Sequence, residues 1–160
     1  MRMTSADAPR HPSLLDDANK VIVEQLQQDG RMSYAAIGKV VGLSEAAVRS
    51  RVQRLVDSGV IQIIAVTNPV EMGFARQAMI GISVSGPPEP VAEALEALDE
   101  VDYVVITAGS YDILVEVVCE SDSHLRTLIS SGIRSVPGVL RTETFMYLEL
   151  RKQTYSWEVK

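Results

Sequence analysis

The stretch KVVGLSEAAVRSRVQRLVDSG, residues 39–59, constrains the fold of this chain more than any other. It predicts two helices joined by a tight turn at Gly42. The second helix begins at Ser44, whose hydroxyl can accept a hydrogen bond from a free amide of the first turn, and it ends at Gly59, which tolerates the left-handed conformation. Its apolar residues recur at a spacing that forms one buried stripe: Val48, Val52 and Leu55.

The opposite side of this second helix carries small and basic residues. Small side chains near the start of a helix allow it to approach a surface closely, and arginines suit phosphates and the edges of guanine bases. This pattern is typical of the recognition helix of a helix-turn-helix. The alternative is an amphipathic helix with an ordinary solvated basic face. The residues of this side are Ala46, Ala47, Ser50 and Arg54, with Arg49 and Arg51 on its flanks.

The net charge of -6 is divided unevenly along the chain. Residues 1–66 hold eight basic and seven acidic side chains, whereas residues 67–160 hold seven basic and fourteen acidic ones. The acidic excess therefore belongs to the C-terminal part, which we do not expect to contact DNA. The N-terminal part is only locally basic, so we expect weak DNA binding by one copy and stronger binding by several.

Composition excludes several other classes of protein. At 46% hydrophobic and 22% charged residues, the chain has enough apolar material for a core. Its apolar runs are too short to span a membrane, and its first residues lack the apolar core of a signal peptide, which predicts a cytoplasmic protein without membrane contact. The single cysteine, Cys119, excludes an intrachain disulfide and is expected to be a small buried hydrophobe.

The N-terminal half predicts a compact three-helix domain. Residues 1–13 lack periodicity and are expected to form a flexible arm. Residues 14–60 form the helix-turn-helix domain, in which Asp16 caps a first helix that ends at Gly30, and Ser33 caps a short second one. Residues 61–74 are a connecting strand and linker, because VIQIIAVT is rich in β-branched residues and Asn68-Pro69 marks a boundary.

Residues 75–150 change from helical to alternating patterns. Strands and helices are expected in the order β-α-β-β-α-β, with Pro90 opening the first helix and Asp122 or Ser123 capping the second. The last strand is expected over residues 139–150, followed by a tail, residues 151–160, that either contacts another subunit or is frayed. This order predicts an α+β protein: a helix-turn-helix domain followed by a ferredoxin-like domain.

Right-handed crossovers place both helices of a ferredoxin-like domain on one face of its sheet. The other face stays open, and here it is half apolar. Leu114 and Val118 share it with Glu116, and Phe145 and Tyr147 share it with charged residues. Such a face predicts a partner subunit, and reading a two-fold DNA site also needs a dimer.

These segments together resemble the Lrp/AsnC family of transcriptional regulators, also called leucine-responsive or feast/famine regulators. The resemblance rests on LDDANKVIVEQLQQDGR, GLSEAAVRSRVQRLVDSGVI, GSYDILVEV and VPGVLRTETFMYL, in that order. It covers about residues 15–148. Two positions depart from the family pattern: Asn19, where an acid that helps to order the first helix is usual, and Ser110, which is often acidic.

The resemblance implies a sequence-specific regulator of double-stranded DNA that dimerises through its C-terminal sheet and often assembles into octamers. It also implies an amino acid or a similar small effector, bound in clefts between dimers, and no other cofactor. The effector turn then comprises Gly109, Ser110, Tyr111 and Asp112. The chemistry is reasonable, because free amides near Gly109 suit a carboxylate and Asp112 suits an ammonium group. The alternative is a plain hairpin turn.

For DNA, we expect Arg51 and Arg54, with Ser50, Ala46 and Ala47, to enter the major groove. Ser44, at the start of the helix, is also expected to contact DNA. Phosphate contacts are expected from Arg49 and from Lys39 or Ser33. An enzyme is not expected, because no metal-ligand cluster, nucleotide loop or nucleophile and base appears. A third class, an architectural DNA-binding protein with weak sequence preference or an assembly protein, stays open.

Overall fold

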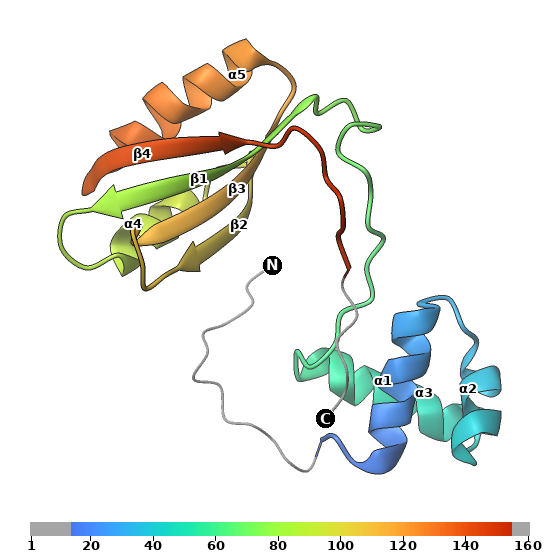
Figure 1. Cartoon of the computed structure of the whole chain (residues 1–160). Helices are drawn as coiled ribbons and strands as arrows, with labels where there is room; N and C mark the ends of the chain where they lie inside the picture. Colours follow the sequence, from blue (N-terminus) through green and yellow to red (C-terminus); the bar gives the residue numbers. More distant parts are fainter. Residues whose placement is uncertain (1–13, 155–160) are drawn as a thin grey trace. The chain divides into compact units, whose positions relative to one another are not determined.

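The computed structural model describes residues 14–154. Its backbone divides into two compact units at Ala65 and Val66 (Figure 1). The predicted arm, residues 1–13, and most of the predicted tail, including Tyr155 and Trp157, lie outside the described residues.

The N-terminal unit contains three helices: α1 (Asp17–Gln28), α2 (Tyr34–Val41) and α3 (Glu45–Asp57). Each begins with the side-chain cap that the sequence predicts. Asp16, Ser33 and Ser44 each accept a hydrogen bond from the backbone amide three residues further on. Four buried side chains from the three helices form the centre of the core: Ile22, Ile37, Val48 and Val52.

The turn between α2 and α3 is held by two glycines. Gly42 has a φ of 71°, the left-handed conformation that favours glycine. The carbonyl oxygen of Gly38 accepts a hydrogen bond of 2.9 Å from the amide of Leu43. A Cβ atom on Gly38 would lie 2.5 Å from the Leu43 carbonyl oxygen, so only glycine fits there without a shift of the backbone.

The segment that follows α3 differs from the prediction of a connecting strand. Residues 60–67 are not paired with any strand in the described part of the chain. Ile63, Ile64 and Val66 are all exposed there. Their β-branched side chains favour an extended backbone, but a strand also needs a neighbour to accept its hydrogen bonds.

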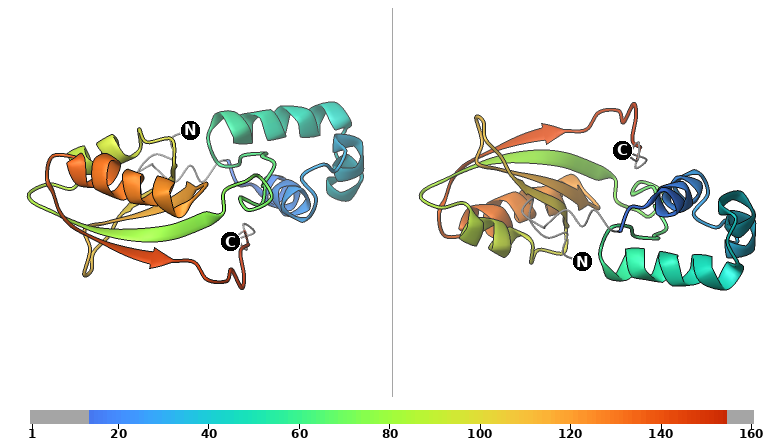
Figure 2. Two further views of the ribbon diagram at one scale, coloured as in Figure 1. Left: turned by 90° about the horizontal axis from the view of Figure 1, so that it is seen from above. Right: turned by 90° about the horizontal axis from the view of Figure 1, so that it is seen from below.

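The C-terminal unit is the ferredoxin-like domain that the sequence predicts. Its main elements are β1 (Arg76–Val84), α4 (Glu89–Leu95), β2 (Val101–Ile106), β3 (Ile113–Cys119), α5 (Asp122–Thr127) and β4 (Val139–Met146). The antiparallel sheet has the strand order β2-β3-β1-β4. Both helices lie on one face (Figure 2). Alternate residues of the central strands face them and are fully buried, among them Ile80, Ile82, Ile113 and Val115.

The second helix of this domain differs from a regular α-helix. Its N-cap is Ser121, which accepts a hydrogen bond from the His124 amide, so the predicted caps Asp122 and Ser123 are wrong by one or two residues. After α5, the chain continues as a π-helical turn, η1 (Leu128–Gly132), and a 3₁₀ turn, η2 (Ile133–Ser135). The amide of Ile133 donates to the carbonyl of Leu128, which brings both side chains into the core.

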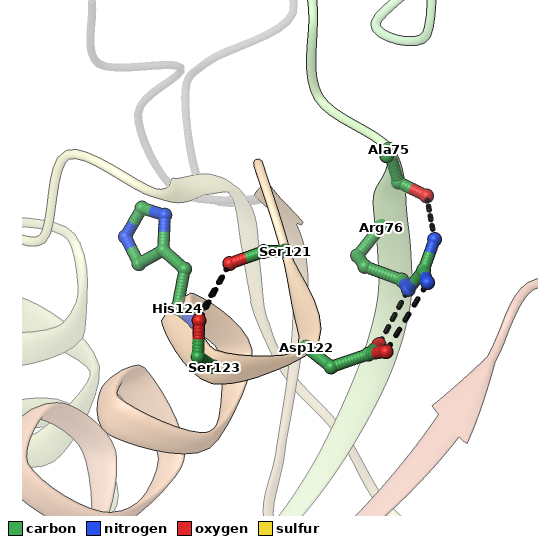
Figure 3. Close-up of polar contacts among 6 residues, drawn as sticks. All are labelled: Ala75, Arg76, Ser121, Asp122, Ser123 and His124. Carbon is green, nitrogen blue, oxygen red and sulfur yellow. Dashed lines mark hydrogen bonds and ion pairs between the residues drawn. The ribbon is translucent and has the colours of Figure 1, made fainter.

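An ion pair joins the start of α5 to the start of β1 (Figure 3). Nε of Arg76 donates to Oδ1 of Asp122 at 2.5 Å, and Nη2 donates to Oδ2 at 3.2 Å. The guanidinium holds the pKa of Asp122 below its usual value. The pair lies at the surface of the domain, where its two side chains are 39% and 77% exposed.

The last strand is shorter than the sequence predicts. β4 ends at Met146, whereas the prediction extended it to Leu150. The amide of Tyr147 still donates to the carbonyl of Gln77 at 2.9 Å. Beyond that point β1 offers little further backbone to pair with, and Leu148 is 98% exposed.

Candidate functional site

The exposed side of α3 carries the small and basic residues that the sequence singled out. Ala46, Ser50 and Arg54 are exposed, and Ala47 is partly exposed. The buried stripe, Val48, Val52 and Leu55, lies on the other side of the helix, as predicted. The Arg54 side chain makes no hydrogen bond or ion pair within residues 14–154, so its guanidinium is available to a ligand.

Arg49 lies at the flank that faces α2. Its Nη2 donates to Oε1 of Glu45 at 2.8 Å, one helical turn earlier. Its guanidinium carbon lies 5.2 Å from the centre of the Tyr34 ring, within the range of a cation–π contact. The side chain is nevertheless 64% exposed, which leaves it accessible to a phosphate.

Arg51 lies at the other flank and contacts α1. Its Nη1 donates to Oδ2 of Asp16 at 2.7 Å and to Oδ1 of Asn19 at 2.9 Å. The hydrogen bond from Arg51 is the main reason why the pKa of Asp16 lies below its usual value. Arg51 is thus engaged inside the domain, an arrangement that its place in the helix pattern did not reveal.

The other predicted DNA contacts have different surroundings. Lys39 is exposed in the last turn of α2. Ser33 and Ser44 use their hydroxyl oxygens as helix caps, each accepting an amide hydrogen bond of 3.2 Å. Their hydroxyl hydrogens stay available as donors to a phosphate oxygen.

The predicted effector turn is anchored to the open face of the sheet by Tyr111. A Cβ atom on Gly81 would lie 2.7 Å from atoms of the Tyr111 ring, so the ring packs directly on the backbone of β1. The ring centre lies 6.1 Å from that of Phe145 in an edge-to-face contact. The Tyr111 hydroxyl donates to Glu143, which raises the pKa of the tyrosine.

Asp112 ends the turn and binds the backbone of β1. Its Oδ2 accepts a hydrogen bond of 2.8 Å from the amide of Val84. Its own amide donates to the carbonyl of Ile82 at 3.0 Å. These contacts are those of the alternative prediction, a structural hairpin turn, but they use only one of the two carboxylate oxygens.

Gly109 and Ser110 form the exposed tip of the turn. A Cβ atom on Gly109 would meet no atom within 4 Å, and the φ of Gly109 is not in the left-handed range. Nothing within the described chain therefore requires glycine at this position. A close approach by a molecule outside this chain would require it.

Two positions that shape the candidate sites escaped the sequence analysis because the role of each depends on a contact with another segment of the chain. Gly38 allows the tight turn before α3, and Gly81 makes room for Tyr111. A glycine inside a strand pattern is a known signal of close approach, so Gly81 was the more detectable of the two.

Among residues 14–154, no three of His, Cys, Asp and Glu are grouped so that they would hold a metal ion. In the same range, none of the helices is both long enough and apolar enough for a membrane span.

Both units match known domain families. Residues 15–56 match the AsnC-type helix-turn-helix domain, and residues 77–157 match the Lrp/AsnC ligand binding domain. The HTH-type transcriptional regulator FL11 of Pyrococcus furiosus is 36% identical over 92% of this chain and 98% of its own length. A proline dehydrogenase transcriptional activator of Rhizobium radiobacter is 33% identical over 88% of this chain and 93% of its own.

Solved structures agree with these matches. The leucine response regulatory protein LrpA of Mycobacterium tuberculosis is 30% identical, with a TM-score of 0.82 over 91% of this chain and 100% of that one. AsnC of E. coli is 26% identical, with a TM-score of 0.77 over 89% and 97%. These matches confirm the family that the sequence motifs indicate: the chain belongs to the Lrp/AsnC family of helix-turn-helix transcriptional regulators.

Proposed function

We propose that the protein controls transcription by reading a DNA site with the exposed side of α3. The observation that carries this proposal is the free guanidinium of Arg54 beside exposed Ser50 and Ala46. In this arrangement Arg54 reads a base edge, Ser50 assists it, and Ala46 and Ala47 allow close approach. Arg49, Lys39, Ser33 and Ser44 lie around this side and contact phosphates.

Replacing Arg54 by glutamine tests this role. We expect the variant to bind its DNA site more weakly by about 1 to 3 kcal/mol and to relax the base preference at one position, because a bidentate base contact is lost. The measurement is a titration of duplexes selected from a randomised pool by the unmodified protein. Arg126→Gln, at an exposed arginine of α5, is the control for the loss of one charge.

An equal loss on selected and random duplexes for Arg54→Gln would contradict base reading. Footprints on long DNA separate the regulator from the second candidate, an architectural protein. Discrete protected sites support regulation at operators, whereas continuous protection supports packing with little sequence preference.

We further propose that an amino acid is the effector and that it binds at the turn Gly109–Asp112. The match to a ligand binding domain supports this, and a regulator of the same fold from Neisseria meningitidis forms a complex with L-Met. The second carboxylate oxygen of Asp112 accepts the ammonium group, and amides at the tip bind the carboxylate. An added Cβ atom on Gly109 would meet no atom of the described chain within 4 Å, so the tip has room for a second subunit, which completes the cleft in this proposal.

Dimers form through the open sheet face in this proposal. Tyr103 and Phe145 are exposed on it, at 51% and 45%. An open sheet face that carries exposed aromatic side chains is usually covered by a partner. Effector binding between dimers then changes their assembly, up to the octamer, and through it the affinity for DNA.

A thermal-shift screen against the twenty amino acids tests the effector proposal. At a ligand concentration of 100 times Kd, we expect a stabilisation of about 2.7 kcal/mol, with a change in assembly size measured by light scattering. Asp112→Asn should abolish this shift, because the amide keeps an acceptor for Val84 but loses the charge that binds the ammonium. Glu120→Gln is the control at an exposed acid. A full shift in Asp112→Asn would contradict the site, and no shift with any amino acid would contradict the effector class.

A further inference from the structure

The arginines of α3 are not equivalent in their surroundings. Arg54 is exposed and unpaired within residues 14–154, and Arg49 is 64% exposed. Arg51 is only 24% exposed and donates two hydrogen bonds to α1. The two acceptors, Asp16 and Asn19, lie at the start of α1. Arg51 therefore links the first helix directly to the recognition helix.

The contacts around Arg51 form a closed network. Oδ1 of Asp16 accepts from the amide of Asn19 at 2.8 Å, and Oδ2 accepts from Arg51. Nδ2 of Asn19 donates to the carbonyl of Leu14 at 2.6 Å, and its Oδ1 accepts from Arg51. Asn19 is only 5% exposed, so without Arg51 its amide oxygen would lose the only donor it has in the described chain.

The network also makes it unfavourable for DNA to withdraw Arg51. Turning the Arg51 side chain away from α1 toward a base would break both hydrogen bonds that Nη1 donates there. It would also break the ion pair of the Asp16 carboxylate, whose side chain is 47% exposed, and leave only the weaker attraction of Arg54. A carboxylate that has lost its ion pair repels a nearby phosphate more strongly, and this repulsion offsets part of the free energy that the new DNA contact of Arg51 would contribute.

We propose that Arg51 is a positioning residue, which holds α1 against α3 through Asp16 and Asn19 and does not contact DNA. Base reading by arginine then falls to Arg54 alone on this helix. The inference rests on the proposed function, because it assumes that α3 binds DNA. It also gives Asn19 a purpose: its amide offers a donor to Leu14 and an acceptor to Arg51 at once, which a carboxylate does not.

The test compares Arg51→Lys and Arg51→Met with the unmodified protein on a duplex selected from a randomised pool and on a random duplex. Affinities are measured at several salt concentrations, well below the melting temperature of each variant. We expect Arg51→Met to weaken binding to both duplexes by the same factor, about threefold to tenfold. Arg51→Lys should restore most of this loss, because its ammonium can still donate to Asp16 and Asn19.

Three roles of Arg51 give three different results. A base contact predicts a loss on the selected duplex alone, with no rescue by lysine, since lysine lacks the fork geometry of arginine. A phosphate contact predicts a lower slope of log affinity against log salt, by about one. A positioning role leaves unchanged both the preference for the selected duplex over the random one and the slope of log affinity against log salt. Either of the first two results would overturn the proposal.

A double-mutant cycle with Asn19→Ala separates the roles a second time. Asn19 is uncharged and buried, so its replacement changes no charge near DNA. If Arg51 acts through α1, the double variant Asn19→Ala/Arg51→Met should bind DNA about as well as the weaker single variant. Additive losses would overturn the proposal.

Failure of the proposed function is recognised separately. If the unmodified protein shows no preference for any selected duplex, the proposal that α3 reads DNA bases is wrong. The positioning role of Arg51 is then tested by the melting temperatures of the variants alone. Arg51→Met should then lower the melting temperature, whereas Arg54→Met should not. Equal melting temperatures for the two variants would overturn the positioning role.

Discussion

Replacing Gly38 with alanine is expected to destabilise the helix-turn-helix unit by about 1 to 3 kcal/mol, the usual cost of overpacking. The sign of this change in the free energy of unfolding is informative, because replacing glycine by alanine in a helix interior normally stabilises a protein. Here the new Cβ would lie 2.5 Å from the carbonyl oxygen of Leu43, which is backbone and cannot rotate away. The turn before α3 would have to open, so DNA binding should weaken together with stability.

Urea unfolding followed by circular dichroism measures the first effect, and titration of a selected duplex measures the second. Gly30→Ala is the matched control in the same unit, because its Cβ would meet no atom closer than 3.8 Å. It should leave both measurements nearly unchanged. A Gly38→Ala variant that is more stable than the unmodified protein would show that the turn tolerates a side chain.

Truncation of Ile80 is expected to have the largest effect on the C-terminal unit. Ile80 lies in the middle of β1, is fully buried and faces the helices, so alanine would leave a cavity in the centre of the core. Such changes typically cost about 2 to 5 kcal/mol, and Ile80→Val should cost about 0.5 to 1.5 kcal/mol. Because the helix-turn-helix unit has a core of its own, its unfolding should change little.

Calorimetry resolves the two units when they unfold separately. The melting temperature of the C-terminal transition should fall in the order unmodified protein, Ile80→Val, Ile80→Ala. Ile106→Ala is the control for the same chemistry at a half-exposed site of β2. An effect of Ile106→Ala as large as that of Ile80→Ala would mean that burial in this unit does not determine stability.

The order of helices and strands was predictable from the sequence because each signal is local. The caps at Asp16, Ser33 and Ser44 and the left-handed Gly42 depend on residues within one turn. Alternation in β1 and β3 likewise follows from one buried face.

The features that the sequence did not reveal depend on contacts between different segments of the fold. The contacts of Arg51 require α1 to lie beside α3, and the role of Gly38 requires the position of a carbonyl in the next turn. The segment 60–67 has the composition of a strand but has no partner in the described chain. The candidate effector turn was found by its motif, whereas its anchor, Tyr111 on Gly81, needed the strand register.

The π-helical turn after α5 has a consequence for comparing this chain with its relatives. The hydrogen bond of a π-helical turn joins residues that are five apart, so the turn contains one residue more than an α-helical turn. A relative with one residue fewer between Leu128 and Ile133 would therefore form an ordinary α-helix and keep the same flanking side chains in its core. In an alignment, a one-residue gap belongs inside this helix and not in the neighbouring loops.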